Sequence, residues 1–515
     1  MTPRGTQRSD LSSAQLPRPW TGRPLITRDL THDAVVVVPG IMGSALREAT
    51  GSRRLLWGLE DLGWLLSAWQ GRGESLRRLH LDESERSGRY GRVEPAGLLR
   101  LPAWAPFLHG LEPYDHLLKT VRDAVADPAA VLAFAYDWRL PVEVNGALLA
   151  EAAHRHLAAW RGSEAHSRAR RLHPDEREAR LVFVAHSMGG LVTRAAFARA
   201  AAHGSDLGAD TRSVVTLGTP FLGSVKAAVI LGGNRSDPLP ALPGRRMQAL
   251  ARTLPGVHDL LPDYRCVDAG RDVLRLTPSD VAALGGDKEL AAAAQDFQRR
   301  MRAPSTPDLP GHRAVVGVAQ PTAQSLRLED GVVYEQYLSF ERDGDGELAR
   351  DPAAGLPVRR DRAGDGTVYR DAAALSGGKA VTWLPLQHGS LAKDGVALAH
   401  VRAILTERDQ DLGPALGAGG IGLDLPDCVE AGRPWLARLT PAPGEELDSH
   451  AGIACSVHDA ESDRRVGTGR LGWHDGAVAA SVTLPAPGLY RIRVTTEGAP
   501  PLTQLVLALD LTDPI

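Results

Sequence analysis

The sequence predicts an α/β fold with a mostly parallel sheet, followed by a smaller all-β unit. Up to about residue 407, uninterrupted runs of β-branched and other apolar residues recur, and such runs are typical of strands buried on both faces. Stretches with apolar residues at helical spacing separate several of these runs, which favours βαβ crossovers between parallel strands. Beyond about residue 412 the helical stretches stop, and short strand-like runs alternate with turns.

Composition and charge exclude several classes of protein. The 515 residues include 59 Lys+Arg and 62 Asp+Glu, which gives a formal net charge of -3, and 43% of them are hydrophobic. These proportions are typical of globular chains and not of disordered ones. The near-zero net charge, without a basic run, predicts no binding of nucleic acid. No apolar run reaches the roughly 18 residues of a membrane-spanning helix, so we expect no transmembrane segment.

The N-terminal residues 1–30 are polar and rich in proline, and we expect them to form a disordered tail. They contain no apolar segment followed by a small-residue cleavage site. We therefore expect no secretory signal and a cytoplasmic location. The three cysteines, Cys266, Cys428 and Cys455, are too few for a disulfide framework, although Cys428 and Cys455 could pair within the C-terminal unit.

Six apolar runs are predicted to form the parallel sheet. The first lies within residues 33–44 and ends in a Pro-Gly pair, which predicts a tight turn. The other five strands are predicted within residues 131–138, 181–187, 213–220, 313–319 and 379–386. Helices are predicted over residues 142–161, 189–204 and 391–407. A β-hairpin around residues 344–346 is expected between the last two strands.

Two long insertions interrupt this alternation. Residues 55–70 are rich in Trp and Leu, and we predict a helical stretch there. Residues 225–265 are broken repeatedly by Pro and Gly, and irregular segments of that length usually serve as lids or binding loops. We therefore divide the unit over residues 31–411 into a core, a cap insertion at about 50–112 and a lid at about 225–263.

The C-terminal unit is expected to be a β-sandwich-like domain over residues 424–515. A Gly-rich stretch at 413–423 predicts a linker, and the strand-like runs after it have the turn-separated spacing of small sandwiches. We expect this unit to have a core of its own, and the sequence does not indicate its partner.

The motif AHSMGG, residues 185–190, follows a predicted strand and precedes a predicted helix. This is the context of the G-x-S-x-G nucleophile elbow, whose strained turn requires small residues on both sides of the serine. Ala185 takes the place of the first glycine, and Gly189 supplies the second. The motif makes Ser187 the candidate nucleophile and predicts an α/β-hydrolase fold, with a mostly parallel sheet.

The partners of such a serine follow it in the order Asp/Glu, then His. Asp365 in GDGT and His388 in QHGS fit this order, each in a loop after a late strand or hairpin. His388 would accept the proton of Ser187, and Asp365 would orient the imidazole and stabilise its charged form. His186 and Asp394 are the nearest competitors; we expect His186 to point away from the serine and Asp394 to lie in a helix.

An oxyanion hole requires two backbone N–H groups, one after the nucleophile and one from the loop after an early strand. Met188 supplies the first. The second is expected at Ile41 in the turn PGIMGS, because its glycines let the backbone turn inward. This chemistry requires no cofactor and no metal ion.

Seven motifs in order resemble the lecithin:cholesterol acyltransferase family and its bacterial members: PGIMGS, AYDWR, AHSMGG, TLGTPFLGS, LLP, GDGTV and HGSL, between residues 39 and 391. The resemblance covers about residues 33–407. It implies a catalytic Ser187, Asp365 and His388, oxyanion donors at Ile41 and Met188, a lid at 225–263 and a cap near 57–69. Ala185 in place of glycine departs from the family pattern, and the β-rich C-terminal unit lies outside the resemblance.

The expected function is a serine-dependent lipid acyltransferase or lipase that forms an acyl-enzyme on Ser187. Expected partners are a lipid or ester substrate and a membrane surface in peripheral contact. Tryptophans are candidates for lipid contact, since an indole suits a membrane interface or an acyl chain; these are Trp57, Trp64, Trp69 and Trp138. The alternatives are a carboxylesterase or triacylglycerol lipase without acyl transfer, and a non-catalytic lipid-binding protein on a hydrolase core.

Overall fold

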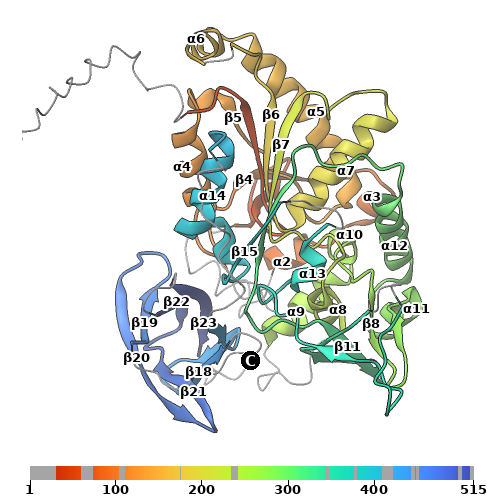
Figure 1. Cartoon of the computed structure of the whole chain (residues 1–515), viewed down its shortest axis with the longest axis vertical. Helices are drawn as coiled ribbons and strands as arrows, with labels where there is room; N and C mark the ends of the chain where they lie inside the picture. Colours follow the sequence, from red (N-terminus) through yellow and green to blue (C-terminus); the bar gives the residue numbers. More distant parts are fainter. Residues whose placement is uncertain are drawn as a thin grey trace, which may run out of the picture.

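The structure is a computed structural model. It describes residues 30–58, 74–103, 111–173, 176–232, 242–342, 347–375, 380–408, 421–441, 447, 452–496 and 501–510. The parallel sheet and its helices fill the upper part of Figure 1, and the C-terminal strands, in blue, lie below them. Among the described residues, no helix is both long and apolar enough to cross a membrane.

The central sheet has six strands, all parallel, which confirms the predicted fold class. Their order across the sheet is β15 (Val381–Leu384), β10 (Arg313–Gly317), β7 (Thr211–Leu217), β6 (Leu181–His186), β1 (Ala34–Val38) and β5 (Val131–Ala133). Every residue of β1 is fully buried, as expected for the run AVVVV in a sheet covered on both faces. Five of the six strands fall within the predicted runs, and β7 begins two residues before its run, at Thr211.

Helices cover both faces of this sheet. Helices α5 (Val142–Arg161) and α7 (Met188–Ala202) pack together on one face, whereas α4 (Asp115–Ala124) and α14 (Gly395–Leu405) pack on the other (Figure 1). The short helix η2 (Pro128–Ala130) precedes β5, and α6 (Glu164–Leu172) follows α5. The bounds of α5 are those predicted. The predicted helix over 391–407 is divided between η3 (Gly389–Ala392) and α14.

The region expected as a cap contains a three-stranded sheet instead of a helix at its start. Strand β2 (Ser44–Glu48) lies between β3 (Leu55–Trp57) and β4 (Val93–Leu98), and the short helices α2 (Glu74–Arg78) and α3 (Glu83–Arg86) lie between β3 and β4. The helical prediction is therefore wrong for Leu55–Trp57, where pairing with β2 overrides it. The rest of the predicted helix, from residue 59, lies outside the described residues.

The region expected as a lid contains three helices, α8 (Val225–Gly232), α9 (Leu242–Ala251) and α10 (Pro255–His258), and residues 233–241 between the first two lie outside the description. A four-stranded sheet packs beside them. Its order is β12 (Val332–Gln336), β11 (Ser325–Glu329), β8 (Arg265–Asp268) and β9 (Val273–Arg275). Helices α11 (Pro278–Ala283) and α12 (Lys288–Arg302) follow β9.

A β-hairpin precedes the one expected around residues 344–346. Strand β12 pairs with β11 across the turn at Asp330 and Gly331, a turn that the sequence analysis missed. Around residues 344–346, which lie outside the described residues, an antiparallel bridge joins Arg342 to Leu348. The two-residue strands β13 (Ser339–Phe340) and β14 (Arg359–Arg360) pair with each other, and α13 (Arg370–Ala373) follows them.

The C-terminal strands form one eight-stranded sheet that turns back on itself at β20 (Arg465–His474). The first half of β20 pairs with β19 and its second half with β21, so the sheet has two halves. Residues from both halves meet in one apolar cluster, which gives the unit its sandwich-like character. The other strands are β16 (Ile421–Asp424), β17 (Cys428–Glu430), β18 (Pro434–Pro441), β19 (Ala454–Asp459), β21 (Ala477–Thr483), β22 (Gly488–Thr495) and β23 (Leu502–Leu509). Cys428 and Cys455 are both buried and do not form a disulfide.

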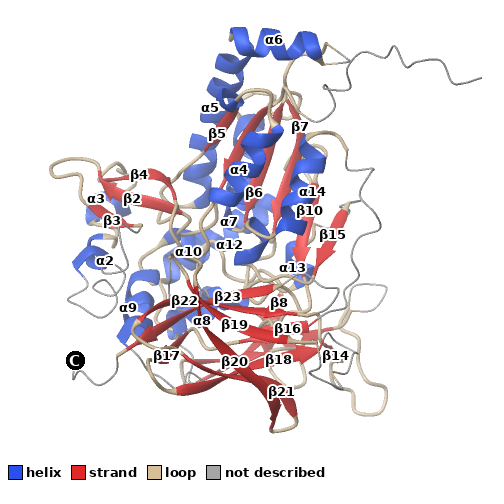
Figure 2. Ribbon diagram, turned by 90° about the vertical axis from the view of Figure 1, so that its left-hand side faces the viewer, coloured by secondary structure: helices blue, strands red, loops and turns tan. Residues whose placement is uncertain are grey.

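One surface of the C-terminal sheet is continuous with the main core. In β23, Val506 and Ala508 join the sheet's own apolar cluster, whereas Leu505, Leu507 and Leu509 join the core of the α/β part. Three residues from other segments of the C-terminal unit also join that core, namely Cys428, Ala460 and Leu489. A buried ion pair crosses the same contact. Nε and Nη2 of Arg491 donate to Oε1 and Oε2 of Glu112, each at 2.9 Å. The C-terminal sheet therefore lies at the carboxyl ends of the parallel strands (Figure 2).

Candidate active site

Ser187 occupies a strained turn between β6 and α7. Its backbone has φ 53° and ψ −128°, a combination that is uncommon for any residue other than glycine. The turn also requires a close approach of two chain segments. A Cβ atom at Gly189 would lie 2.5 Å from the carbonyl oxygen of Pro39, so only glycine fits there. The backbone at Ser187 thus has the strained strand–turn–helix geometry that the motif predicts.

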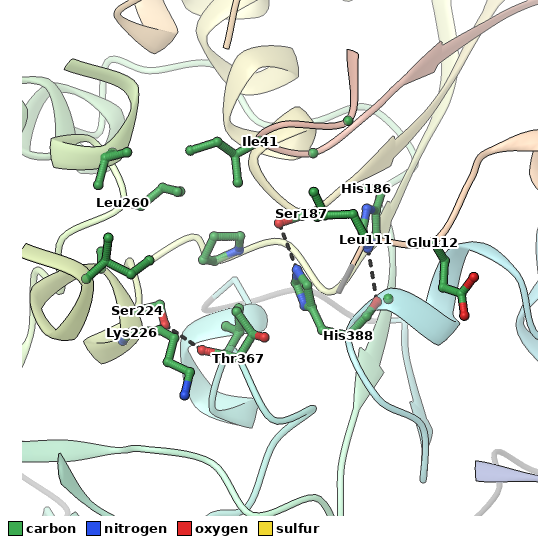
Figure 3. A pocket seen from close by; sticks show the side chains of 18 of the residues that line it. Ile41, Leu111, Glu112, His186, Ser187, Ser224, Lys226, Leu260, Thr367 and His388 are labelled. Atoms are coloured by element: carbon green, nitrogen blue, oxygen red, sulfur yellow. Dashed lines mark hydrogen bonds between the residues drawn. The ribbon is translucent and has the colours of Figure 1, made fainter. Parts of the chain in front are cut away.

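The three residues predicted to act together are in contact. Nε2 of His388 lies 2.8 Å from Oγ of Ser187 (Figure 3). Nδ1 of His388 lies 2.7 Å from Oδ2 of Asp365. A carboxylate only accepts hydrogen bonds, so Nδ1 carries the proton and Nε2 presents its lone pair to the serine hydroxyl. Oδ1 of Asp365 accepts the backbone N–H groups of Thr367 and Val368 at 2.9 and 2.7 Å. These bonds fix the carboxylate and therefore the imidazole.

The two backbone groups predicted as oxyanion donors lie at the same end of the site. Met188 begins α7, so its N–H is one of the first-turn amides that have no acceptor within the helix. Ile41 lines the cleft beside Ser187, in the turn between β1 and β2 (Figure 3). The next residue of that turn, Met42, has φ 57°. The role of these two amides as oxyanion donors stays a prediction.

Three aromatic side chains donate hydrogen bonds to backbone carbonyl oxygens of this turn. The indole N–H of Trp57 donates to the carbonyl oxygen of Met42 at 2.8 Å, and that of Trp138 donates to the carbonyl oxygen of Ser44 at 3.0 Å. The hydroxyl of Tyr136 donates to the carbonyl oxygen of Pro39 at 2.9 Å. The motif AYDWR therefore belongs to the framework of the predicted oxyanion turn.

These hydrogen bonds correct the prediction that Trp57 and Trp138 contact lipid. Trp57 is 0% exposed and Trp138 is 1% exposed, and the two rings meet edge to face with centroids 5.8 Å apart. Neither residue lines the cleft next to Ser187. Their hydrogen bonds and burial give them a packing role, which a Trp-rich pattern alone does not distinguish from lipid contact. Trp64 and Trp69 lie outside the described residues.

His186 forms no hydrogen bond with the serine hydroxyl, as predicted. It instead contacts the backbone of His388, a contact that the sequence did not predict. Its Nε2–H donates to the carbonyl oxygen of His388 at 3.1 Å, so its Nδ1 accepts from the hydroxyl of Tyr114 at 2.8 Å. The same hydroxyl accepts the N–H of Gly40 at 2.8 Å. Burial, together with the nearby His388, lowers the pKa of His186 to about 3, so this ring is neutral. This series of hydrogen bonds connects the predicted oxyanion turn to the loop that carries His388.

The other competitor, Asp394, caps α14, where its carboxylate accepts the N–H of Val396 at 2.8 Å. Burial raises the pKa of Asp394. Its side chain is engaged in the helix start, and it has no contact with His388 among those described. The order of the motifs therefore selected the carboxylate that lies beside the imidazole.

A mainly apolar cleft opens at Ser187. Its walls enclose about 860 Å³, the part open to solvent included. Five apolar side chains on the far wall come from the region expected as a lid, namely Ala227, Ile230, Met247, Val257 and Leu260. Among the described residues, no group of three or more His, Cys, Asp or Glu side chains is placed to hold a metal ion.

Comparison with known proteins gives a match to one family over part of the chain and several similar solved structures. No curated protein is significantly similar in sequence. The protein resembles a chain of the Tle4-Tli4 complex, with 17% identity over 73% of this chain and 98% of that chain and a TM-score of 0.43. It also resembles the propeptide form of lipase BlEst2 from Bacillus licheniformis, with 14% identity over 92% and 73% of the two chains and a TM-score of 0.29. A further similar structure is phospholipase PlaB from Legionella pneumophila, with 10% identity, 94% and 90% coverage and a TM-score of 0.24.

Residues 109–299 match the sequence pattern of one family, described as lecithin:cholesterol acyltransferase. The matched segment contains the AYDWR motif and the elbow around Ser187, and it ends before Asp365 and His388. The motifs outside this segment, which include those of Asp365 and His388, are therefore supported only by the geometry of the site. Over residues 109–299, the chain is therefore similar to the lecithin:cholesterol acyltransferase family.

Proposed function

We propose that the protein is a serine-dependent lipid acyltransferase or lipase that forms an acyl-enzyme on Ser187. The observation that carries the proposal is the continuous hydrogen-bond path from Ser187 through His388 to Asp365 at the mouth of an apolar cleft. A packing role for these residues would not require a serine with positive φ, an imidazole with its lone pair towards the hydroxyl, and an apolar cleft at the same point.

The proposed first half-reaction transfers the acyl group to the enzyme. Oγ of Ser187 attacks the ester carbonyl carbon while Nε2 of His388 takes the hydroxyl proton. The carbonyl oxygen becomes an anion that the N–H groups of Ile41 and Met188 stabilise. The intermediate then collapses, the bond to the alcohol oxygen breaks, and His388 returns the proton to the leaving alcohol. Asp365 holds the imidazole and stabilises its charged form throughout.

The proposed second half-reaction reverses these roles with a new nucleophile. Water or an acceptor alcohol gives its proton to His388 and attacks the acyl-enzyme, which releases an acid or a new ester. Hydrolysis and transfer differ only in which nucleophile reaches the acyl group, so exclusion of water from the cleft decides between them. The apolar far wall supports an acyl chain as its occupant, since such a chain would replace water there.

An ester panel tests the proposal and separates its alternatives. We expect turnover of long-chain esters with or without a phospholipid headgroup, and a new ester product when a long-chain alcohol is added. Hydrolysis without any transfer product would favour a lipase or carboxylesterase, and Ser187→Ala should abolish turnover in either case. The matched control is Ser205→Ala, a serine that follows α7 and bonds His154 away from the cleft. If Ser187→Ala retained the activity of this control, the proposal would be wrong.

A further inference from the structure

A second cavity adjoins the first on the side of His388. It encloses about 670 Å³, part of it open to solvent, and shares five lining residues with the apolar cleft, namely Glu112, Lys226, Thr367, His388 and Gly389. Its other wall comes from the C-terminal sheet, with residues 423–425 at the end of β16 and 503–505 in β23. We call this cavity the polar chamber. Figure 3 shows His388 between Ser187 on one side and Glu112 and Thr367 on the others.

The lining of the polar chamber differs in kind from that of the cleft. It includes six uncharged hydrogen-bonding side chains that come from several distant parts of the chain: Tyr337, Thr367, Gln387, Ser390, Thr503 and Gln504. Hydrogen bonds join the two walls. The side-chain amide of Gln387 donates to Oε1 of Gln504 at 2.7 Å, and the hydroxyl of Ser390 donates to the carbonyl oxygen of Thr503 at 3.2 Å. The chamber is therefore built jointly by both parts of the protein.

Charges at the chamber are balanced. The carboxylate of Glu112 is neutralised by Arg491 at 2.9 Å and by Lys393 at 3.3 Å. Lys226 lies 3.5 Å from the carboxylate of Glu335. Burial acts to lower the pKa of Lys226, but nearby carboxylates, including those of Glu335, Asp427 and Asp424, outweigh burial and raise it, so the ammonium group stays charged.

These charges disfavour an occupant with a net charge. The carboxylates of Asp365 and Asp424 and the ammonium group of Lys226 all line the chamber, so an ion of either sign would meet a like charge as well as an opposite one. A neutral group that both donates and accepts hydrogen bonds fits the lining without either repulsion. Hydroxyl groups meet this requirement, because each donates one hydrogen bond and accepts two.

We propose that the polar chamber binds the alcohol part of the ester, and that this part is a small neutral polyol of the glycerol type. The proposal rests on the proposed function, since His388 protonates the leaving alcohol oxygen and deprotonates an incoming one. The alcohol must therefore lie on the His388 side of Ser187, where the polar chamber begins, while the acyl chain lies in the apolar cleft. The C-terminal sheet then determines which alcohols react.

Two esters that share the same acyl chain and differ in the alcohol test whether the chamber binds the alcohol part. Monobutyryl glycerol and propyl butyrate differ in two hydroxyl groups of the alcohol part. Thr503→Val keeps the side-chain shape and removes one hydroxyl from the chamber wall. We expect the ratio of kcat/KM for the glycerol ester to that for the propyl ester to fall about 3- to 10-fold, the effect of one hydrogen bond. The control is Ser462→Ala, in the turn after β19, which should leave the ratio unchanged.

A binding measurement separates the failure of this inference from failure of the proposed function. Saturation-transfer NMR on Ser187→Ala protein reports which ligand protons touch the protein without turnover. Contact of the glycerol protons of monobutyryl glycerol, weakened by adding Thr503→Val, supports the chamber even if no ester is cleaved. Contact of the butyryl protons alone, or an unchanged kcat/KM ratio in Thr503→Val, overturns it. Loss of both esters in equal proportion also overturns it, because that result indicates a structural role.

Discussion

The hydroxyl of Tyr136 is a single group on which the predicted oxyanion turn depends. It is the donor to the buried carbonyl oxygen of Pro39, at the start of the turn that carries Ile41. Tyr136→Phe leaves that carbonyl without this donor, so we expect the free energy of unfolding to fall by about 1–3 kcal/mol. We expect kcat to fall more than KM changes, because the turn would hold the anionic oxygen less well. Chemical denaturation and ester kinetics measure both quantities.

Tyr90→Phe is the matched control for this change, since Tyr90 is 39% exposed and distant from the turn in sequence. Equal behaviour of the two variants in unfolding and in kcat would contradict the role assigned to Tyr136. The same logic applies to Trp57 and Trp138, whose hydrogen bonds to the turn replace the lipid contact expected from their residue type.

Asp365 permits a test at the other end of the site. Asp365→Asn preserves the size of the side chain but can present an amide N–H to Nδ1 of His388, which would favour the wrong imidazole tautomer. We expect kcat to fall by orders of magnitude, about 10⁴-fold where this exchange has that effect on the base. Asp361→Asn, four residues earlier and bonded to Gln324, is the control. The acid would be misassigned if Asp361→Asn abolished activity while Asp365→Asn remained near full rate.

At the scale of elements, the start of α5 introduces a pH dependence into folding. The carboxylate of Asp259, in the segment after α10, accepts the N–H of Val142 at 2.8 Å. Burial raises the pKa of Asp259 from 3.8 to about 7. The folded state thus favours the protonated acid, so its contribution to stability is full below about pH 4 and is lost as the pH rises through about 7.

Asp259→Asn stays neutral and can still accept the N–H of Val142. We therefore expect the Tm of this variant to exceed that of the unmodified protein by more at pH 8 than at pH 5. Glu151→Gln, which removes an exposed carboxylate further along α5, should show no such trend beyond the loss of its ion pair with Arg155. A Tm difference for Asp259→Asn that is constant between the two pH values would exclude an ionisation of Asp259 in this range.

The elements that the sequence predicts best are those set by local pattern. The buried strands and α5 have an apolar periodicity that survives any tertiary arrangement, and the elbow motif fixes the position of Ser187 between β6 and α7. Leu55–Trp57 was predicted wrongly because a Trp/Leu-rich run fits a buried strand as well as a helix. Pairing with β2, eleven residues earlier at its start, decides for the strand.

At the scale of the whole molecule, the contacts between the two parts could not be predicted. Glu112 and Arg491 are 379 residues apart, and neither belongs to a motif. The order Ser, Asp, His locates Ser187, Asp365 and His388 because a known arrangement constrains them. No such constraint links Thr503 to Ser390, so the polar chamber is visible only in three dimensions.

The change in composition after residue 412 predicts a separable C-terminal unit, whereas the packing predicts the opposite. A chain ending at residue 411 would expose the apolar surface that faces Leu505, Leu507 and Leu509, and it would remove Arg491 from the buried Glu112. Exposure costs about 25 cal/mol per Å², so we expect an aggregated protein or one with a much lower Tm. A soluble, cooperatively unfolding and active truncated chain would contradict this expectation.

The most direct test of the central claim is to identify the residue that carries the acyl group. A fluorophosphonate ester reacts with an activated serine as an ester substrate does, and mass spectrometry of the digested protein locates the adduct. The account predicts one adduct, on the peptide containing Ser187, which is absent in Ser187→Ala and forms much more slowly in Asp365→Asn. An adduct on another serine, together with ester turnover by Ser187→Ala, would contradict it.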